Sequence, residues 1–207
     1  MIAAAARDAL IPLGFWREGR SRVWLADRGF WLAVVEFQPS SFSKGSYLNV
    51  SAHWLWSAMP EILSFDYRVQ RQQPWIKFED VAQFGPLVDQ LAQQAAKESR
   101  QLEAKIGDIR SAAAVLVAEE TAYANEGRGG GWPAFNAAIA SGIVGDMVIA
   151  RKLFSSAYHS IGAGRPDLQR LLVPYSEAIK KKSTFSNFIA LQIDKQRAKF
   201  KLSPFKK

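Results

Sequence analysis

The sequence has no cysteine and only two histidines among its 207 residues. Without cysteine the chain has no disulfide, no Cys-ligated zinc or iron–sulfur cluster and no thiol nucleophile. His53 and His159 lie in different segments and not at the i, i+4 spacing of a helical metal site,. We therefore predict no His-based metal site and no cofactor, while a magnesium site made of carboxylates alone stays open.

Long apolar runs are also missing. No stretch approaches about 18 uncharged apolar residues, so the sequence predicts no transmembrane segment,. The apolar N-terminus differs from a signal peptide, because no basic residue precedes it and Arg7 and Asp8 interrupt it,. These features favour a cytoplasmic protein.

No catalytic signature is present either. There is no G-x-S-x-G elbow and no S-x-x-K beside a matching second motif,. The carboxylate pairs at 79–80 and 119–120 are typical of helix caps and solvated helix faces,. Whether the chain is an enzyme therefore stays open, with a non-catalytic role favoured.

Aromatic residues, by contrast, make up 12% of the chain, which predicts a folded globular protein,. The formal net charge is +8, and residues 151–207 hold 13 of the 27 basic side chains but 3 of the 19 acidic ones. Such a local excess can attract nucleic acid, anionic lipid or an acidic protein. It can equally be a solubilising helix surface.

Three segments in the first third of the chain have the pattern of β-strands. Residues 22–26 and 30–37 are rich in β-branched and aromatic types, and the short loop between them, ending in Gly29, indicates a hairpin,. In residues 47–56, alternation places Trp54 and Trp56 on an apolar face,. A fourth strand at 65–70 is possible.

Helical patterns surround these strands. A short helix opens the chain and ends near Gly14, and from Phe78 onward the apolar spacing is helical, with a start or kink expected at Pro86 and an N-cap at Asp108,. The predicted fold is α+β: an N-terminal helix, an antiparallel sheet of three or four strands packed on a long helix, and an all-helical extension. We predict a sheet domain at 1–106 and a helical domain or extension at 107–207, with the glycine-rich loop 127–131 as the rival boundary.

The N-terminal part resembles a known family. The pattern comprises a leading helix ending in "L..LGF", a hairpin of aromatic strands, and "V..FQ.S.F....Y.NV", which runs here from Val34 to Val50. It is similar to a bacterial family classed as a domain of unknown function, over residues 10–106. The resemblance implies the fold and supplies no activity, cofactor or site residue.

Five residues are candidates for a small-ligand site. Asn49, Ser51 and His53 fall together on the more polar face of the third strand, and Lys44 lies in the loop before it,. Arg128, in the glycine-rich loop before a predicted helix start, could hold an anion with free backbone N–H groups, although a flexible joint explains the loop equally simply,.

The second candidate surface is the basic C-terminal region. Six of its residues are candidate polyanion contacts: Lys180, Lys181, Lys182, Lys195, Arg197 and Lys199. Basic residues interleaved with aromatics suit phosphate attraction and stacking, and suit equally an amphipathic helix with snorkelling lysines. The leading hypothesis is a non-catalytic module that binds a macromolecular partner, with nucleic acid one such partner. The alternative is a small-ligand-binding protein or enzyme that uses the face around His53. The oligomeric state is not predicted.

Overall fold

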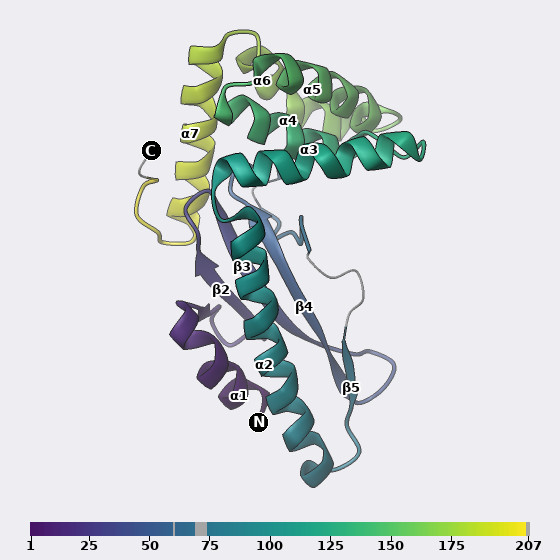
Figure 1. Ribbon diagram of the computed structural model, residues 1–207, viewed down its shortest axis with the longest axis vertical. Coiled ribbons are helices and arrows are strands. Elements are labelled where there is room, and N and C mark those ends of the chain that lie inside the picture. The colour runs from purple at the N-terminus through teal and green to yellow at the C-terminus, as the bar shows by residue number, and fades with distance from the viewer. Residues whose placement is uncertain (60, 69–73, 206–207) are drawn as a thin grey trace. The chain divides into compact units, whose positions relative to one another are not determined.

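The computed structural model describes residues 1–59, 61–68 and 74–205 and has the predicted α+β architecture (Figure 1). An N-terminal helix, α1 (Ile2–Leu10), precedes an antiparallel sheet, and a series of helices follows it. The sheet has five strands in the order β1-β2-β3-β4-β5. They are β1 (Trp16–Arg17), β2 (Val23–Asp27), β3 (Trp31–Pro39), β4 (Gly45–Trp54) and β5 (Trp75–Lys77).

The register of the central hairpin follows from the alternation of its side chains. Trp31 pairs with Trp54, and Val35 pairs with Val50, so their apolar side chains share one face of the sheet,. On that face Trp54 is fully buried, as predicted, and its indole stacks on Phe30 with ring centroids 6.2 Å apart. The opposite face of β4 is buried as well from Leu48 onward, so neither face of this strand faces water.

Two helices lie on the same side of this sheet. α1 and the 26-residue α2 (Val81–Ile106) both run across the front of the strands in Figure 1. Buried apolar side chains of α2, such as Val88 and Leu91, recur at helical spacing,. Pro86 lies inside α2, in its second turn, so of the two predicted alternatives, a start or a kink, the helix start is wrong.

The sheet differs from the prediction at both edges. β1 and β5 are two and three residues long and were not predicted, because such short segments show no alternation,. Residues 65–68 form no strand: Tyr67 makes only an isolated bridge to Ala52, and residues 69 and 70 lie outside the described part. β4 ends at Trp54, so Trp56 does not extend the apolar face of this strand.

The remaining elements are helices with identifiable ends. They are α3 (Ile109–Asn125), α4 (Gly131–Val144), α5 (Met147–Gly162), α6 (Pro166–Ala178) and α7 (Lys182–Lys199). Asp108 is the N-cap of α3, as predicted, since its carboxylate accepts from the N–H groups of Arg110 and Ser111,. Gly145 ends α4 in the left-handed conformation at φ 98°, which favours glycine,.

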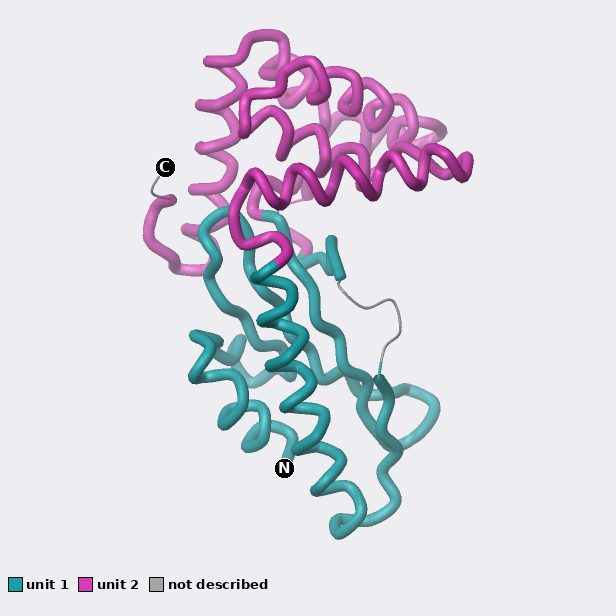
Figure 2. The backbone as a smooth tube through the Cα atoms, in the orientation of Figure 1, with its two compact units in different colours: residues 1–54, 63–104 teal, residues 55–62, 105–207 magenta. Residues whose placement is uncertain are grey.

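The chain forms two compact units (Figure 2). Unit 1 comprises residues 1–54 and 63–104 and holds the sheet with α1 and most of α2. Unit 2 comprises residues 55–62 and 105–207 and holds the helices α3 to α7. Residues 55–62 thus belong with the helices, although they lie between strands in the sequence. The predicted division into a sheet domain at 1–106 and a helical domain or extension at 107–207 stays a prediction.

Candidate functional site

The polar face of β4 is buried. Asn49, Ser51 and His53 do share a face, opposite Glu36, Val34 and Leu32 of β3, but each is at most 3% exposed. The Asn49 amide donates to the carboxylate of Glu36 and to the side-chain oxygen of Gln38, both at 2.9 Å. These three candidates for a small-ligand site are therefore not open to solvent, and Asn49 is held by its neighbours on β3.

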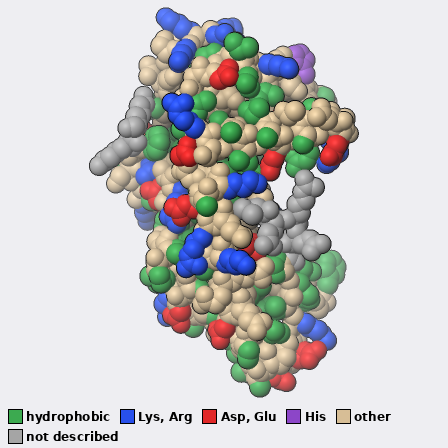
Figure 3. Space-filling model, viewed as in Figure 1, with side chains coloured by type: hydrophobic (Ala, Val, Ile, Leu, Met, Phe, Trp, Pro, Cys, Tyr) green, Lys and Arg blue, Asp and Glu red, His purple; other side chains and the backbone are tan. Residues whose placement is uncertain are grey.

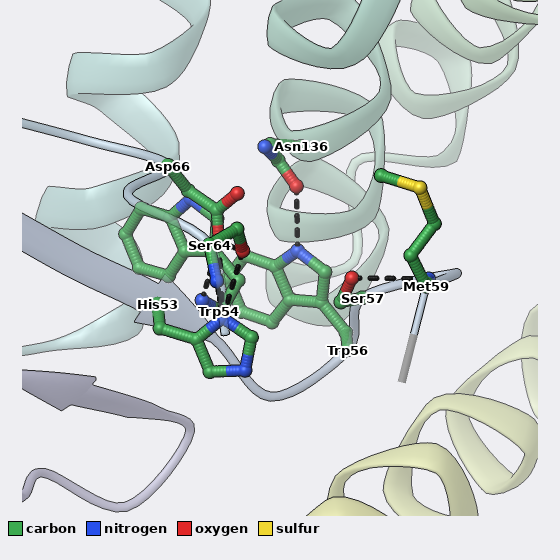
Figure 4. A network of polar contacts seen from close by, with 8 residues as sticks. All are labelled: His53, Trp54, Trp56, Ser57, Met59, Ser64, Asp66 and Asn136. Carbon is green, nitrogen blue, oxygen red and sulfur yellow. Dashed lines mark hydrogen bonds and ion pairs between the residues drawn. The ribbon is translucent and has the colours of Figure 1, made fainter. Parts of the chain in front are cut away.

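His53 is part of a polar network within unit 1 (Figure 4). Its Nδ1 lies 2.8 Å from the Ser64 hydroxyl and accepts from the Ser64 backbone N–H at 3.3 Å. The Ser64 hydroxyl and the Trp54 N–H donate to the same oxygen of Asp66, at 2.8 and 2.9 Å. The network joins the end of β4 to the segment that returns beside it.

This set contains a serine, a histidine and a carboxylate, but it is not arranged as a catalytic triad. A triad needs the carboxylate at one ring nitrogen and the nucleophile at the other. Here Ser64 and Asp66 both lie on the Nδ1 side of His53, with Asp66 Oδ2 3.6 Å from that nitrogen. Asp66 therefore does not orient the imidazole to take a proton from Ser64 at the opposite ring nitrogen, and the arrangement favours a structural role.

A second network lies within unit 2. The indole N–H of Trp56 donates to the Asn136 side chain at 3.1 Å (Figure 4). The Tyr175 hydroxyl donates to the Trp56 carbonyl at 2.9 Å, and burial raises the pKa of this phenol,. These contacts hold Trp56 against α4 and α6, which no pattern in the sequence indicated.

The glycine-rich loop offers little to an anion. Arg128 pairs with Glu126 and lies 5.0 Å above the Tyr123 ring, and the bond to Glu126 raises the pKa of the guanidinium. The Gly130 N–H, which could have bound an anion, donates at 2.6 Å to the buried carboxylate of Glu120. Carboxylates thus already contact both donors of the expected site.

Lys44 lies apart from the other candidates, on the loop that joins β3 to β4. It lines a groove in unit 1 together with Arg22, Phe78 and Phe84. These residues come from four separate segments of the chain, so no local motif could have identified them as a group. Among the described candidates, Lys44 and Arg128 are exposed, and of these two only Lys44 lines a groove with no carboxylate paired to its side chain.

The six predicted polyanion contacts divide into two groups. Lys180 pairs with Glu177, Lys199 pairs with Glu61, and Arg197 is 5% exposed with its Nε donating to the Ser203 carbonyl. Lys181, Lys182 and Lys195 are exposed, and no hydrogen bond or ion pair joins their side chains to another described residue. The second group keeps its charge available for a partner.

A basic cluster forms where α6 is joined to α7. Arg151 of α5, which sequence reasoning did not single out, donates to the backbone carbonyls of Ile179 and Lys180 at 3.2 and 3.0 Å. This contact places its guanidinium beside the three consecutive lysines. We call the group of Arg151, Lys180, Lys181 and Lys182 the basic joint.

The lysines of the basic joint lie at the start of α7. Lys181 is its N-cap residue, with no side-chain cap bond, and the first-turn N–H groups carry the positive end of the helix dipole,. Two carboxylates are close in the chain or in space: Glu177 pairs with Lys180, and Asp146 caps α5 through the Ile149 N–H. On the face shown in Figure 3, Lys and Arg side chains lie in separate groups divided by apolar and neutral surface.

The chain matches no protein-family model, no curated protein and no solved structure. The resemblance to the bacterial family therefore stays a prediction. Over the described residues no helix is long and apolar enough to cross a membrane. Within the same residues, no three His, Asp or Glu side chains converge as a group that could hold a metal ion.

Proposed function

We propose that the protein is a non-catalytic interaction module that binds a polyanionic macromolecule through the basic joint. The observation that carries this proposal is the pair Lys181 and Lys182, exposed at the start of α7 and free of ion pairs to other described residues. The neighbouring guanidinium of Arg151 and the helix dipole add to the positive field at this point,.

Duplex nucleic acid is the first polyanion to test against this positive field. Phosphates lie at regular spacing along it, so several cations can be neutralised at once, and the counterions released supply the binding free energy. The proposal includes a bacterial cytoplasmic setting, which is supported only by the family resemblance and the sequence features given above.

The alternative, a small-ligand-binding protein or enzyme working around His53, has less support. Its three strand residues are buried, and the serine and carboxylate contact the same side of the imidazole. A reacting group would have no route to Ser51, which is fully buried,.

The test is a salt titration of binding to a fluorescent duplex of arbitrary sequence. The variant Lys181→Gln/Lys182→Gln should lower the slope of log K against log salt by about 2, because two phosphate contacts are lost. The matched control, Lys97→Gln/Arg100→Gln, removes two exposed charges from α2 and should leave the slope unchanged. An absence of binding at low salt, or equal slopes for the two variants, would overturn the proposal.

A further inference from the structure

Unit 1 contains a groove that the proposed function does not use. It consists of two adjoining hollows of about 320 and 290 Å³, which share the side chains of Ile2, Arg22, Phe78 and Phe84. Trp24 of β2 lines the first hollow, and Lys44 of the β3–β4 loop lines the second. Each volume is in the range of small-molecule sites.

The floor of the groove is aromatic and rigidly placed. Trp24 is 3% exposed and Phe84 is 7% exposed, and the Phe78 and Phe84 rings meet edge to face at 5.1 Å. Trp24 belongs to β2 and Phe84 to the start of α2, so the core of unit 1 sets their positions, while Phe78 lies in the segment between β5 and α2. Phe78 and Ile2 are partly exposed above these buried rings, so an apolar ligand would gain free energy by covering these two side chains,.

Backbone contacts fix the two cationic residues on its rim. The Lys44 carbonyl accepts from the Phe78 N–H at 2.9 Å, and the Arg22 carbonyl accepts from the Phe37 N–H at 3.1 Å. Gly45, beside Lys44, packs so tightly on β5 that a Cβ there would lie 2.3 Å from the Ile76 carbonyl oxygen. The loop therefore presents Lys44 from a defined place.

The charges on this rim are not paired with any other residue in the described part of the chain. Neither Arg22 nor Lys44 makes a side-chain hydrogen bond or ion pair to another described residue, and both are exposed. The two carboxylates that follow Phe78 in the chain are engaged elsewhere: Glu79 pairs with Lys77 at 3.0 Å, and Asp80 accepts from the Gln83 N–H at 2.8 Å. Arg17 donates to two backbone carbonyls of its own turn.

We propose that this groove binds a small organic anion, with one acidic group at Arg22 and Lys44 and an apolar body on Ile2 and Phe78, above the buried rings of Trp24 and Phe84. Two cations with free donors suit a carboxylate, sulfonate or phosphate monoester, because charge-assisted hydrogen bonds are the strong ones. The aromatic floor explains why the ligand has an apolar body. A polyanion would leave that floor uncovered, so the groove and the basic joint are separate sites for different ligands.

The test uses two probes that differ in charge. 8-Anilinonaphthalene-1-sulfonate has the sulfonate and the apolar rings, and N-phenyl-1-naphthylamine has the rings without the charge. We expect the sulfonate to bind the full chain at one site and the neutral probe to bind more weakly. Arg22→Gln/Lys44→Gln should weaken sulfonate binding about tenfold or more, the loss expected for charge-assisted hydrogen bonds, and leave the neutral probe unaffected.

The control Arg20→Gln/Lys97→Gln removes two exposed charges of unit 1 that do not line the groove. It should bind the sulfonate as the unaltered protein does. Thermal unfolding verifies that each variant is folded, and Lys44→Gln alone, in an exposed loop, replaces the double variant if the latter is unstable. Equal weakening in test and control, no weakening in either, or displacement of the sulfonate by duplex DNA would overturn the proposal. None of these outcomes depends on whether the basic joint binds a polyanion.

Discussion

The hydroxyl of Ser64 lies 2.8 Å from Nδ1 of His53, the ring nitrogen that the Asp66 carboxylate also approaches. Both partners therefore act on one edge of a ring that is 1% exposed. Because Asp66 also accepts from the Trp54 N–H, the network ties the last residues of β4 to the segment 64–66. The network therefore contributes to the stability of unit 1.

Replacement of Asp66 by alanine should destabilise the protein by about 1–3 kcal/mol, because the Trp54 N–H and the Ser64 hydroxyl lose a charged acceptor,. Chemical denaturation measures this loss. Ser40→Ala is the control: the Ser40 hydroxyl accepts from two N–H groups of an open loop, and its removal should cost under about 0.5 kcal/mol,. Equal losses in the two variants would contradict the structural role of the network.

Trp54→Ala should lower the free energy of unfolding by about 3–5 kcal/mol, since a large, fully buried side chain leaves a cavity beside Phe30 and Tyr67,. Urea or guanidinium titration gives the value. Trp75→Ala provides the comparison, because this indole is only partly buried on β5 and its loss should be smaller. A loss below about 1 kcal/mol for Trp54, as at exposed sites, would show that Trp54 is not part of the core.

Glu98 gives a pH dependence of known sign. Its carboxyl is buried on α2, and this burial raises its pKa, although a hydrogen bond from Gln94 at 2.9 Å opposes the shift. With a raised pKa the folded state holds the proton more tightly than the unfolded state, so this contribution to stability is lost as the pH rises.

Glu98→Gln should therefore have a higher Tm than the unaltered protein at pH 7, and the difference should vanish near pH 4, below the ordinary glutamate pKa of 4.5,. The amide oxygen can still accept from Gln94. Asp89→Asn, exposed on the same helix, should show no such difference. A lower Tm of Glu98→Gln at pH 7 would mean that the charge is stabilised where it lies.

The fold was predictable because its larger elements carry periodic patterns. The alternation across 47–54 matches the register of β4 with β3, and Asp108 at the start of a helical period is the N-cap of α3. β1 and β5 were missed, since two or three residues cannot show a period,. The alternation was extended two residues too far, to Trp56, because a local pattern does not show where a chain leaves its sheet.

The candidate site was predicted less well, for a physical reason. The alternation of polar residues along β4 predicted that Asn49, Ser51 and His53 share a face. Whether that face is buried depends on the segments that cover it, which the alternation does not show. Lys44 was named from its loop, while Phe84 belongs to a helix 40 residues later in the chain and meets it only in the folded unit. Arg151 likewise meets Lys180 only because helices pack together in the folded chain, and no local sequence pattern indicates that contact.

The assignment of residues 55–62 to unit 2 constrains how this protein can be divided or inherited. The chain passes between the two units three times, after residues 54, 62 and 104. A single cut at Gly107 would leave the helical part without Trp56, whose indole and carbonyl bond to Asn136 and Tyr175. A single recombination event could therefore not transfer either unit intact. A gene fusion that keeps the helices must also keep the sheet, because Trp56 lies between two segments of the sheet unit in the chain.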